Sequence, residues 1–126
     1  MPEGKISTYL RTHRLRGKTL SFLLAAEDDE LRERAESAKT GRAAKTLVKE
    51  GPLRITLVAL KQGTTLQSHH VAGPVSLVTI RGLLRVSTAA GDIDIPKDGL
   101  IALDAGVGHS VTALDDCAVL ITLAMK

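Results

Sequence analysis

Residues 75–87 read VSLVTIRGLLRVS, and this stretch decides the fold. Two runs of mostly aliphatic and β-branched residues, 75–80 and 83–87, are separated by Arg81 and Gly82. Runs of this kind favour extended strands, and a glycine between them favours a tight turn. The stretch therefore predicts two strands joined by a turn at Arg81 and Gly82.

Further short strands are predicted on both sides of this pair. They cover residues 43–49, 53–60, 92–95, 100–103, 109–112 and 117–124. In the second of these runs, Leu53, Ile55 and Leu57 alternate with Arg54 and Thr56, which predicts one buried and one solvent-facing side. Short strands with turn residues at close spacing predict an all-β protein, an antiparallel sandwich or barrel.

One short helix is predicted ahead of the strands, at about residues 28–39. Asp28 or Asp29 can cap its N-terminus, and Leu31 and Ala35 share one face. Its acidic residues are interpreted as a solvated face. Because the helix is short and weakly apolar, we expect it to lie on the surface of a larger structure.

The chain has 126 residues, enough for a single hydrophobic core. Residues 28–126 are predicted to form one domain, and residues 1–27 a basic N-terminal extension. The first 18 residues carry five basic side chains and one glutamate, whereas the whole chain has a net charge of only +3. With Tyr9 and Phe22 as its only aromatic residues, the chain lacks a platform on which bases could stack. A nucleic-acid partner is therefore not expected.

Cysteine content and hydropathy indicate the compartment. Cys117 is the single cysteine, which excludes an intrachain disulfide and suits a reducing environment. We expect it to be a small buried residue in a strand. The apolar stretch at residues 20–26 is too short to cross a bilayer. The sequence thus predicts a cytoplasmic protein without membrane attachment.

Three of the four histidines lie where a predicted strand meets a glycine-containing turn: His69, His70 and His109. Adjacent residues on a strand point to opposite faces, so only one of His69 and His70 can face a barrel interior. We expect the inner pair to be His69 and His109. Imidazoles are common ligands of divalent transition metals, so this pair is a candidate metal site.

The spacing of glycines and histidines resembles the cupin family. As in the first cupin motif, Gly63 is followed after five residues by His69, and Gly82 closes the motif. The second histidine and the glutamate of that motif are replaced by Val71 and Val75. The second motif is represented by Gly106 and His109, with Asp104 and Ala113 at its proline and asparagine positions.

The resemblance covers about residues 53–124 and implies a cupin-like antiparallel jelly-roll barrel with one short N-terminal helix. It implies a degenerate metal-ligand set of His69 and His109, which could hold one divalent ion of Zn, Fe, Mn or Ni. Two neutral nitrogens bind such an ion weakly unless further ligands complete the shell. The candidates for this are His70, Gln67, Asp104 or water.

Two functions from different classes follow. In one, the barrel is a non-catalytic pocket for a small organic ligand, lined by Val71, Val75 and Leu77, with or without a metal. In the other, the protein is a metal-dependent cupin enzyme, dioxygenase-like or isomerase-like, acting on a small organic substrate. Whether the chain is an enzyme stays open at this stage. A homodimer is expected, because aliphatic faces and exposed edges of small barrels are commonly buried by pairing.

Overall fold

The structure is a computed structural model that describes residues 19–67 and 73–125. Its elements are α2 (Leu24–Ser37), β1 (Arg42–Glu50), β2 (Leu53–Leu60), β3 (Thr65–Gln67), β4 (Val75–Arg81), β5 (Leu83–Thr88), β6 (Gly91–Pro96), β7 (Leu100–Leu103), β8 (His109–Ala113) and β9 (Cys117–Ala124). A five-stranded sheet has the order β1-β2-β9-β4-β7, and a four-stranded sheet the order β3-β8-β5-β6. The strand pairs are antiparallel. The predicted all-β antiparallel architecture is confirmed.

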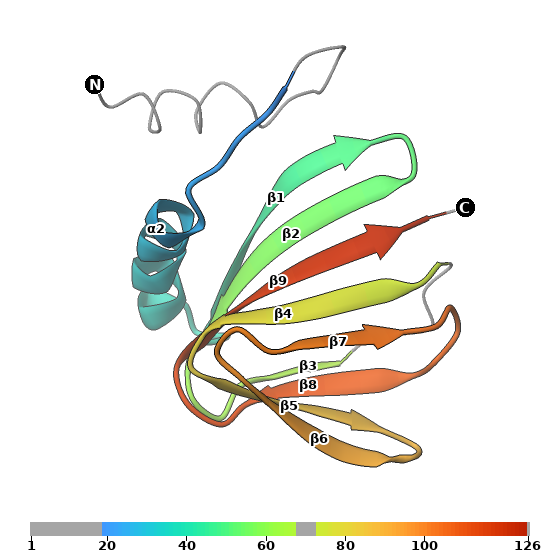
Figure 1. Cartoon of the computed structure of the whole chain (residues 1–126). Coiled ribbons are helices and arrows are strands. Elements are labelled where there is room, and N and C mark those ends of the chain that lie inside the picture. The colour runs from blue at the N-terminus through green and yellow to red at the C-terminus, as the bar shows by residue number, and fades with distance from the viewer. Residues whose placement is uncertain (1–18, 68–72, 126) are drawn as a thin grey trace.

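The turn in the stretch 75–87 carries the chain from one sheet to the other. β4 pairs with β7 and β9 in the larger sheet, whereas β5 pairs with β6 and β8 in the smaller one. Gly82 lies between them at a φ of 82°, where a side chain would run into the Asp116 carbonyl oxygen and Cys117. Glycine is therefore required at the predicted turn. Figure 1 shows the two sheets converging beside α2 and diverging toward the C-terminus.

The structure departs from the predicted elements in two places. β3 was not predicted, because three residues are too few to show a period-two pattern. The helix begins at Leu24 instead of residue 28 and ends at Ser37 instead of residue 39. Its N-cap residue is Leu23, which makes no side-chain capping bond, so the predicted capping role of Asp28 or Asp29 was wrong.

Two hydrophobic clusters share the larger sheet. One fills the barrel interior between the sheets, and the other lies between α2 and the outer face of β1 and β2. A β-bulge after Thr46 turns both Leu47 and Val48 toward the helix-side cluster. Leu20 and Phe22, which precede the helix, pack against the same cluster. Part of the predicted extension, residues 19–27, therefore contributes to packing.

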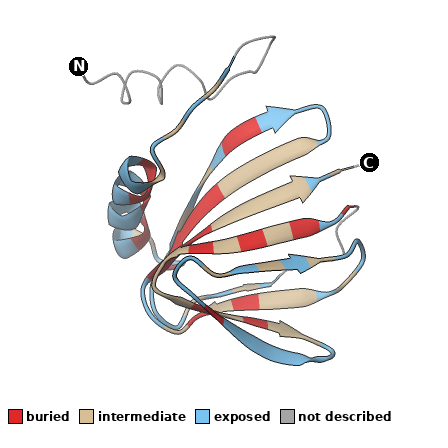
Figure 2. Cartoon of the chain, in the orientation of Figure 1, coloured by how far each residue is buried: buried red, intermediate tan, exposed pale blue. Residues whose placement is uncertain are grey.

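The predicted solvent-facing side of residues 53–60 was wrong. In β2, Leu57 and Ala59 belong to the helix-side cluster, and Val58 and Leu60 belong to the barrel core. Both faces of the strand are thus covered, because the helix lies over the outer one. Figure 2 shows the buried part of β2 at the end near α2.

Two buried carboxylates tie α2 to the barrel through ion pairs, and the prediction that the acidic residues from Asp28 to Glu36 form a solvated face was wrong for Asp28. Glu27 is 1% exposed, and its Oε1 accepts a hydrogen bond from Lys45 Nζ at 2.9 Å. Asp28 is 4% exposed and accepts from Arg81 Nε at 2.7 Å and from Nη2 at 3.1 Å. The hydrogen bond to Asp28 raises the pKa of Arg81 above its ordinary value. No helix in the described part of the chain is long and apolar enough to span a membrane.

Candidate functional site

The burial of the inner face differs between the two ends of the barrel, which we call the closed end and the open end. Along the inner face of β9, Cys117 and Val119 are 0% exposed, whereas Ile121 and Leu123 are only half-buried. β2 repeats this gradient, since Val58 is buried and Thr56 is half-buried. The closed end lies beside α2, and the open end is where the sheets diverge (Figure 1).

Aliphatic side chains of β4 form part of the wall toward this open end. Val75 is paired with Leu103 and Leu123, and Leu77 with Ile101 and Ile121. Val75 and Leu77, two of the three predicted pocket residues, are buried in the barrel core. The third, Val71, lies outside the described residues. The wall is thus apolar, and a pocket at these two positions stays a prediction.

His109 is on the inner face at the open end, in agreement with its predicted inward orientation. It begins β8 opposite Thr88 and shares its face with Val111, a residue of the barrel core. The ring is half-buried, and Nδ1 lies 3.3 Å from the carbonyl oxygen of Val107. A proton on Nδ1 would be donated to that carbonyl, which makes Nε2 the acceptor nitrogen of the ring.

The other predicted metal ligands do not join His109 in the described structure. Gln67 pairs with Ser110, one residue along β8, and is therefore on the opposite face of the sheet. Asp104 is exposed and its carbonyl oxygen accepts the Val107 amide at 3.2 Å, which fits a turn residue. His69 and His70 lie outside the described residues.

The described residues do not fit a divalent metal by themselves. Across residues 19–67 and 73–125, no group of three or more His, Cys, Asp and Glu side chains could hold a metal ion. His109 is the only predicted imidazole ligand within those ranges, and one neutral nitrogen is too weak a ligand set. The metal centre predicted from the sequence therefore stays a prediction.

Sequence reasoning missed two polar residues of the site, Arg54 and Thr56. Their alternation with Leu53 and Ile55 was visible, but it was interpreted as a solvent-facing side. Arg54 instead pairs with Leu123, and Thr56 with Ile121, whose side chains pack on the barrel core. Strand parity thus puts a cation and a hydroxyl on the inner face at the open end.

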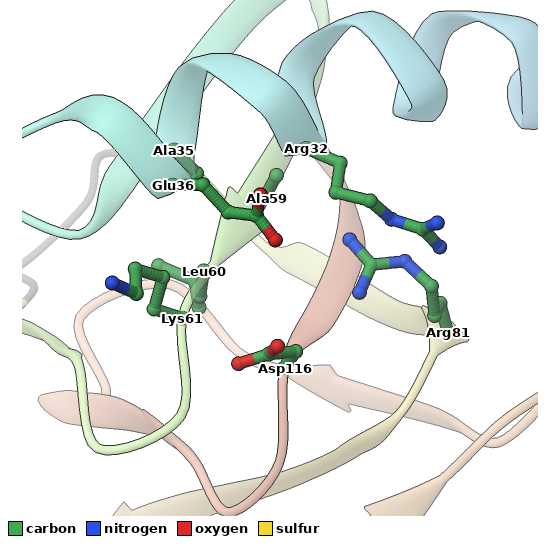
Figure 3. A pocket seen from close by; sticks show the side chains of 8 residues that line it. All are labelled: Arg32, Ala35, Glu36, Ala59, Leu60, Lys61, Arg81 and Asp116. Carbon is green, nitrogen blue, oxygen red and sulfur yellow. The ribbon is translucent and has the colours of Figure 1, made fainter.

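A polar cleft lies at the closed end, under α2. It has an empty volume of about 190 Å³ that opens to solvent, and its charged lining residues are Arg32, Glu36, Lys61, Arg81 and Asp116 (Figure 3). Arg81 is held there by the ion pair to Asp28. Burial raises the pKa of the neighbouring Cys117 thiol to about 12, so this thiol stays protonated at neutral pH. The Arg81 to Asp28 pair beside the cleft therefore anchors the helix to the barrel.

Comparison with known proteins identifies the fold. No family model matches the sequence, and no curated protein matches it closely. Among solved structures, a cupin superfamily protein from Desulfitobacterium hafniense DCB-2 is 13% identical, with a TM-score of 0.65 over 68% of this chain and 78% of that chain. A protein of unknown function from Rhizobium leguminosarum bv. viciae 3841 is 18% identical, with a TM-score of 0.69 over 86% and 99%. KdgF from Halomonas sp. is 14% identical, with a TM-score of 0.64 over 71% and 85%.

At such identities the likeness concerns the fold alone. The two antiparallel sheets and the sheet-changing turn at Gly82 define a jelly-roll barrel. This jelly roll is of the small cupin type, as the resemblance of the glycine and histidine spacing had implied.

Proposed function

We propose that the protein binds a small organic ligand in the open end of the barrel. The observation that carries the proposal is the burial gradient, from 0% exposure at Cys117 and Val119 to half-burial at Ile121 and Leu123. Residues that face a packed barrel along its whole length would be buried at both ends. On β9 and β2 the inner face is buried near α2 and only half-buried at the other end, whereas Val75 and Leu77 of β4 stay buried there as part of the wall.

The composition of the open end fits a ligand site. Small-molecule sites are mostly apolar, with a few polar groups that fix the orientation of the ligand. The apolar part comes from side chains such as Leu77, Ile101 and Ile121. Polar groups on the inner face include Arg54, Thr56, Thr88 and His109.

The alternative is a metal-dependent cupin enzyme, dioxygenase-like or isomerase-like, acting on a small organic substrate. Its support is His109 at the open end, together with the histidine at position 69 of the first motif. An ion of Zn, Fe, Mn or Ni held by these residues would polarise a bound substrate. The ligand-binding proposal does not depend on this ion.

A single tryptophan can test ligand binding, because the natural chain has none. We would place it at Leu103→Trp, on the inner face opposite Val75, and use Leu100→Trp as the control. Leu100 is 63% exposed and on the outer face of the same strand. Hexan-1-ol should shift the emission of the Leu103→Trp variant saturably and leave that of Leu100→Trp unchanged. Equal responses, or none, would remove the proposal.

Metal analysis separates the two functions. The protein would be purified without a histidine tag, and metal content measured for the unmodified chain, His69→Ala and His109→Ala. The enzyme requires about one metal per chain in the unmodified protein, lost in both variants. Much less than one metal per chain in all three samples would remove the enzyme and leave the ligand-binding proposal standing.

A further inference from the structure

Two of the arginines reveal how this chain pairs a guanidinium with a carboxylate. Arg81 uses its Nε and Nη2 edge on Asp28, at 2.7 and 3.1 Å. Arg85 uses the same edge on Asp94, at 2.8 and 3.1 Å. This two-donor edge matches the two oxygens of a carboxylate, which makes the pairing both strong and directional.

Arg54 is held differently. Its Nη1 donates to the carbonyl oxygens of Gly51 at 2.6 Å and of Leu53 at 3.1 Å, in the turn between β1 and β2. Within residues 19–67 and 73–125, no carboxylate pairs with Arg54, and its Nε and Nη2 make no hydrogen bond. The guanidinium is thus fixed by one corner, while its carboxylate-binding edge has no described partner.

The surroundings of Arg54 favour an anion with an apolar body. Its cross-strand neighbours on the inner face are Lys49 and Leu123, and Thr56 follows on the same face. Arg85 and Asp94 form their pair on the outer face of the smaller sheet. Asp92, opposite Ser87, is on the same outer face. By strand parity, the inner-facing positions of the described strands include no aspartate or glutamate.

We propose that the ligand of the open end is a small organic acid whose carboxylate binds the Nε and Nη2 edge of Arg54. Its aliphatic body lies against the wall that includes Ile121 and Leu123. Lys49 adds a second positive charge at the rim. This assignment rests on the proposed ligand-binding function and adds the chemical class of the ligand.

The test compares hexanoate with hexanamide, a neutral compound of nearly the same shape, in NMR titrations of the full chain. Hexanoate should bind about tenfold tighter, the difference expected from a charge-assisted bidentate pair. Arg54→Gln should abolish this preference without changing the affinity for hexanamide. Arg54→Lys keeps the charge without the two-donor edge and should bind hexanoate with intermediate affinity. The matched control Arg85→Gln, on the outer face, should behave like the unmodified chain.

Three results would overturn the assignment. Equal affinities of the unmodified chain for the two compounds, with shifts at Ile121 and Leu123, would leave the ligand-binding function standing without a carboxylate. A hexanoate preference that survives Arg54→Gln would place the anion elsewhere, for instance in the cleft at Arg32 and Lys61. Absence of shifts on the inner face with either compound would remove the proposed function itself. Circular dichroism of each variant confirms that the barrel is folded.

Discussion

Asp28 makes the contact that decides how the helix is attached. Its carboxylate is 4% exposed and is paired with Arg81 through two hydrogen bonds. Asp28→Asn would leave the Arg81 guanidinium without its counter-charge, and we expect a loss of about 2 kcal/mol or more in the free energy of unfolding. Asp94→Asn is the control, because the Arg85 to Asp94 pair is exposed and surface pairs contribute little. Urea unfolding measures the free energy of unfolding of both variants. Equal values for the two would show that the Asp28 to Arg81 pair does not hold the helix.

Cys117 gives the protein a pH dependence at alkaline pH. Burial raises its pKa from 9.0 to about 12, so the folded chain keeps the thiol proton that the unfolded chain loses first. Stability contributed by this proton is complete below about pH 9 and declines as the pH rises toward 12. Between pH 8 and about 10.5 the natural chain should lose about 1–2 kcal/mol more than Cys117→Ala. Urea unfolding at several pH values measures this difference. If the free energy of unfolding falls equally with pH in the two proteins, the thiol does not contribute.

Residue-level predictions from the sequence succeeded where strand parity alone decides the outcome. Cys117 is buried in a strand, and His109 is on the inner face, both as predicted. The prediction failed for Arg54, since parity alone cannot say that the apolar side of β2 faces a helix and the mixed side faces the barrel. That distinction depends on where α2 packs, which is a tertiary property.

At the scale of elements, α2 is held mainly by its buried side. Leu31 is 0% exposed in the cluster between the helix and the sheet. Leu31→Ala should lower the free energy of unfolding by about 2–5 kcal/mol, because it removes buried methyl groups and leaves a cavity. Leu23→Ala, at a residue 61% exposed, should change it by less than about 0.5 kcal/mol. If thermal denaturation finds the two variants alike, the helix does not share the core.

The helix is also the element whose bounds were predicted least well. Asp28 and Asp29 had the composition of N-terminal caps, and so the start was placed at residue 28. The helix extends back to Leu24, which packs on the cluster between helix and sheet, and Glu27 and Asp28 lie inside it with ionic partners on β1 and β4, which are distant in the sequence. Strands β2, β7 and β9 were predicted with their observed bounds, since proline, glycine or aspartate directly precedes each of them.

For the whole molecule, the expected homodimer stays a prediction, and the structure offers a specific surface as its interface. Leu120, Val78 and Leu100 are in register across β9, β4 and β7 on the outer face of the larger sheet. Leu100 is 63% exposed, and neither of the other two is fully buried. If this row pairs with a second copy, Leu100→Glu should convert a dimer to a monomer in light scattering, whereas Ile93→Glu on the smaller sheet should not. A dimer that survives Leu100→Glu would place the interface elsewhere.

The cytoplasmic location and the absence of nucleic-acid and membrane partners also stay predictions from composition. Residues 1–18, which carry five basic side chains and one glutamate, lie outside the described residues. The function proposed for the protein depends on the barrel alone.

The central claim is that the open end of the barrel receives the ligand, and methyl NMR tests it most directly. Aliphatic residues with methyl groups lie at the open end, at the closed end and on the outer face, so one titration with hexanoate can compare these three regions. We predict saturable shifts for Leu77, Ile101, Ile121 and Leu123, and none for the closed-end residues Leu60 and Leu84 or the outer residue Leu100. Shifts confined to the outer face or to the cleft under α2, or no shifts at all, would contradict the account.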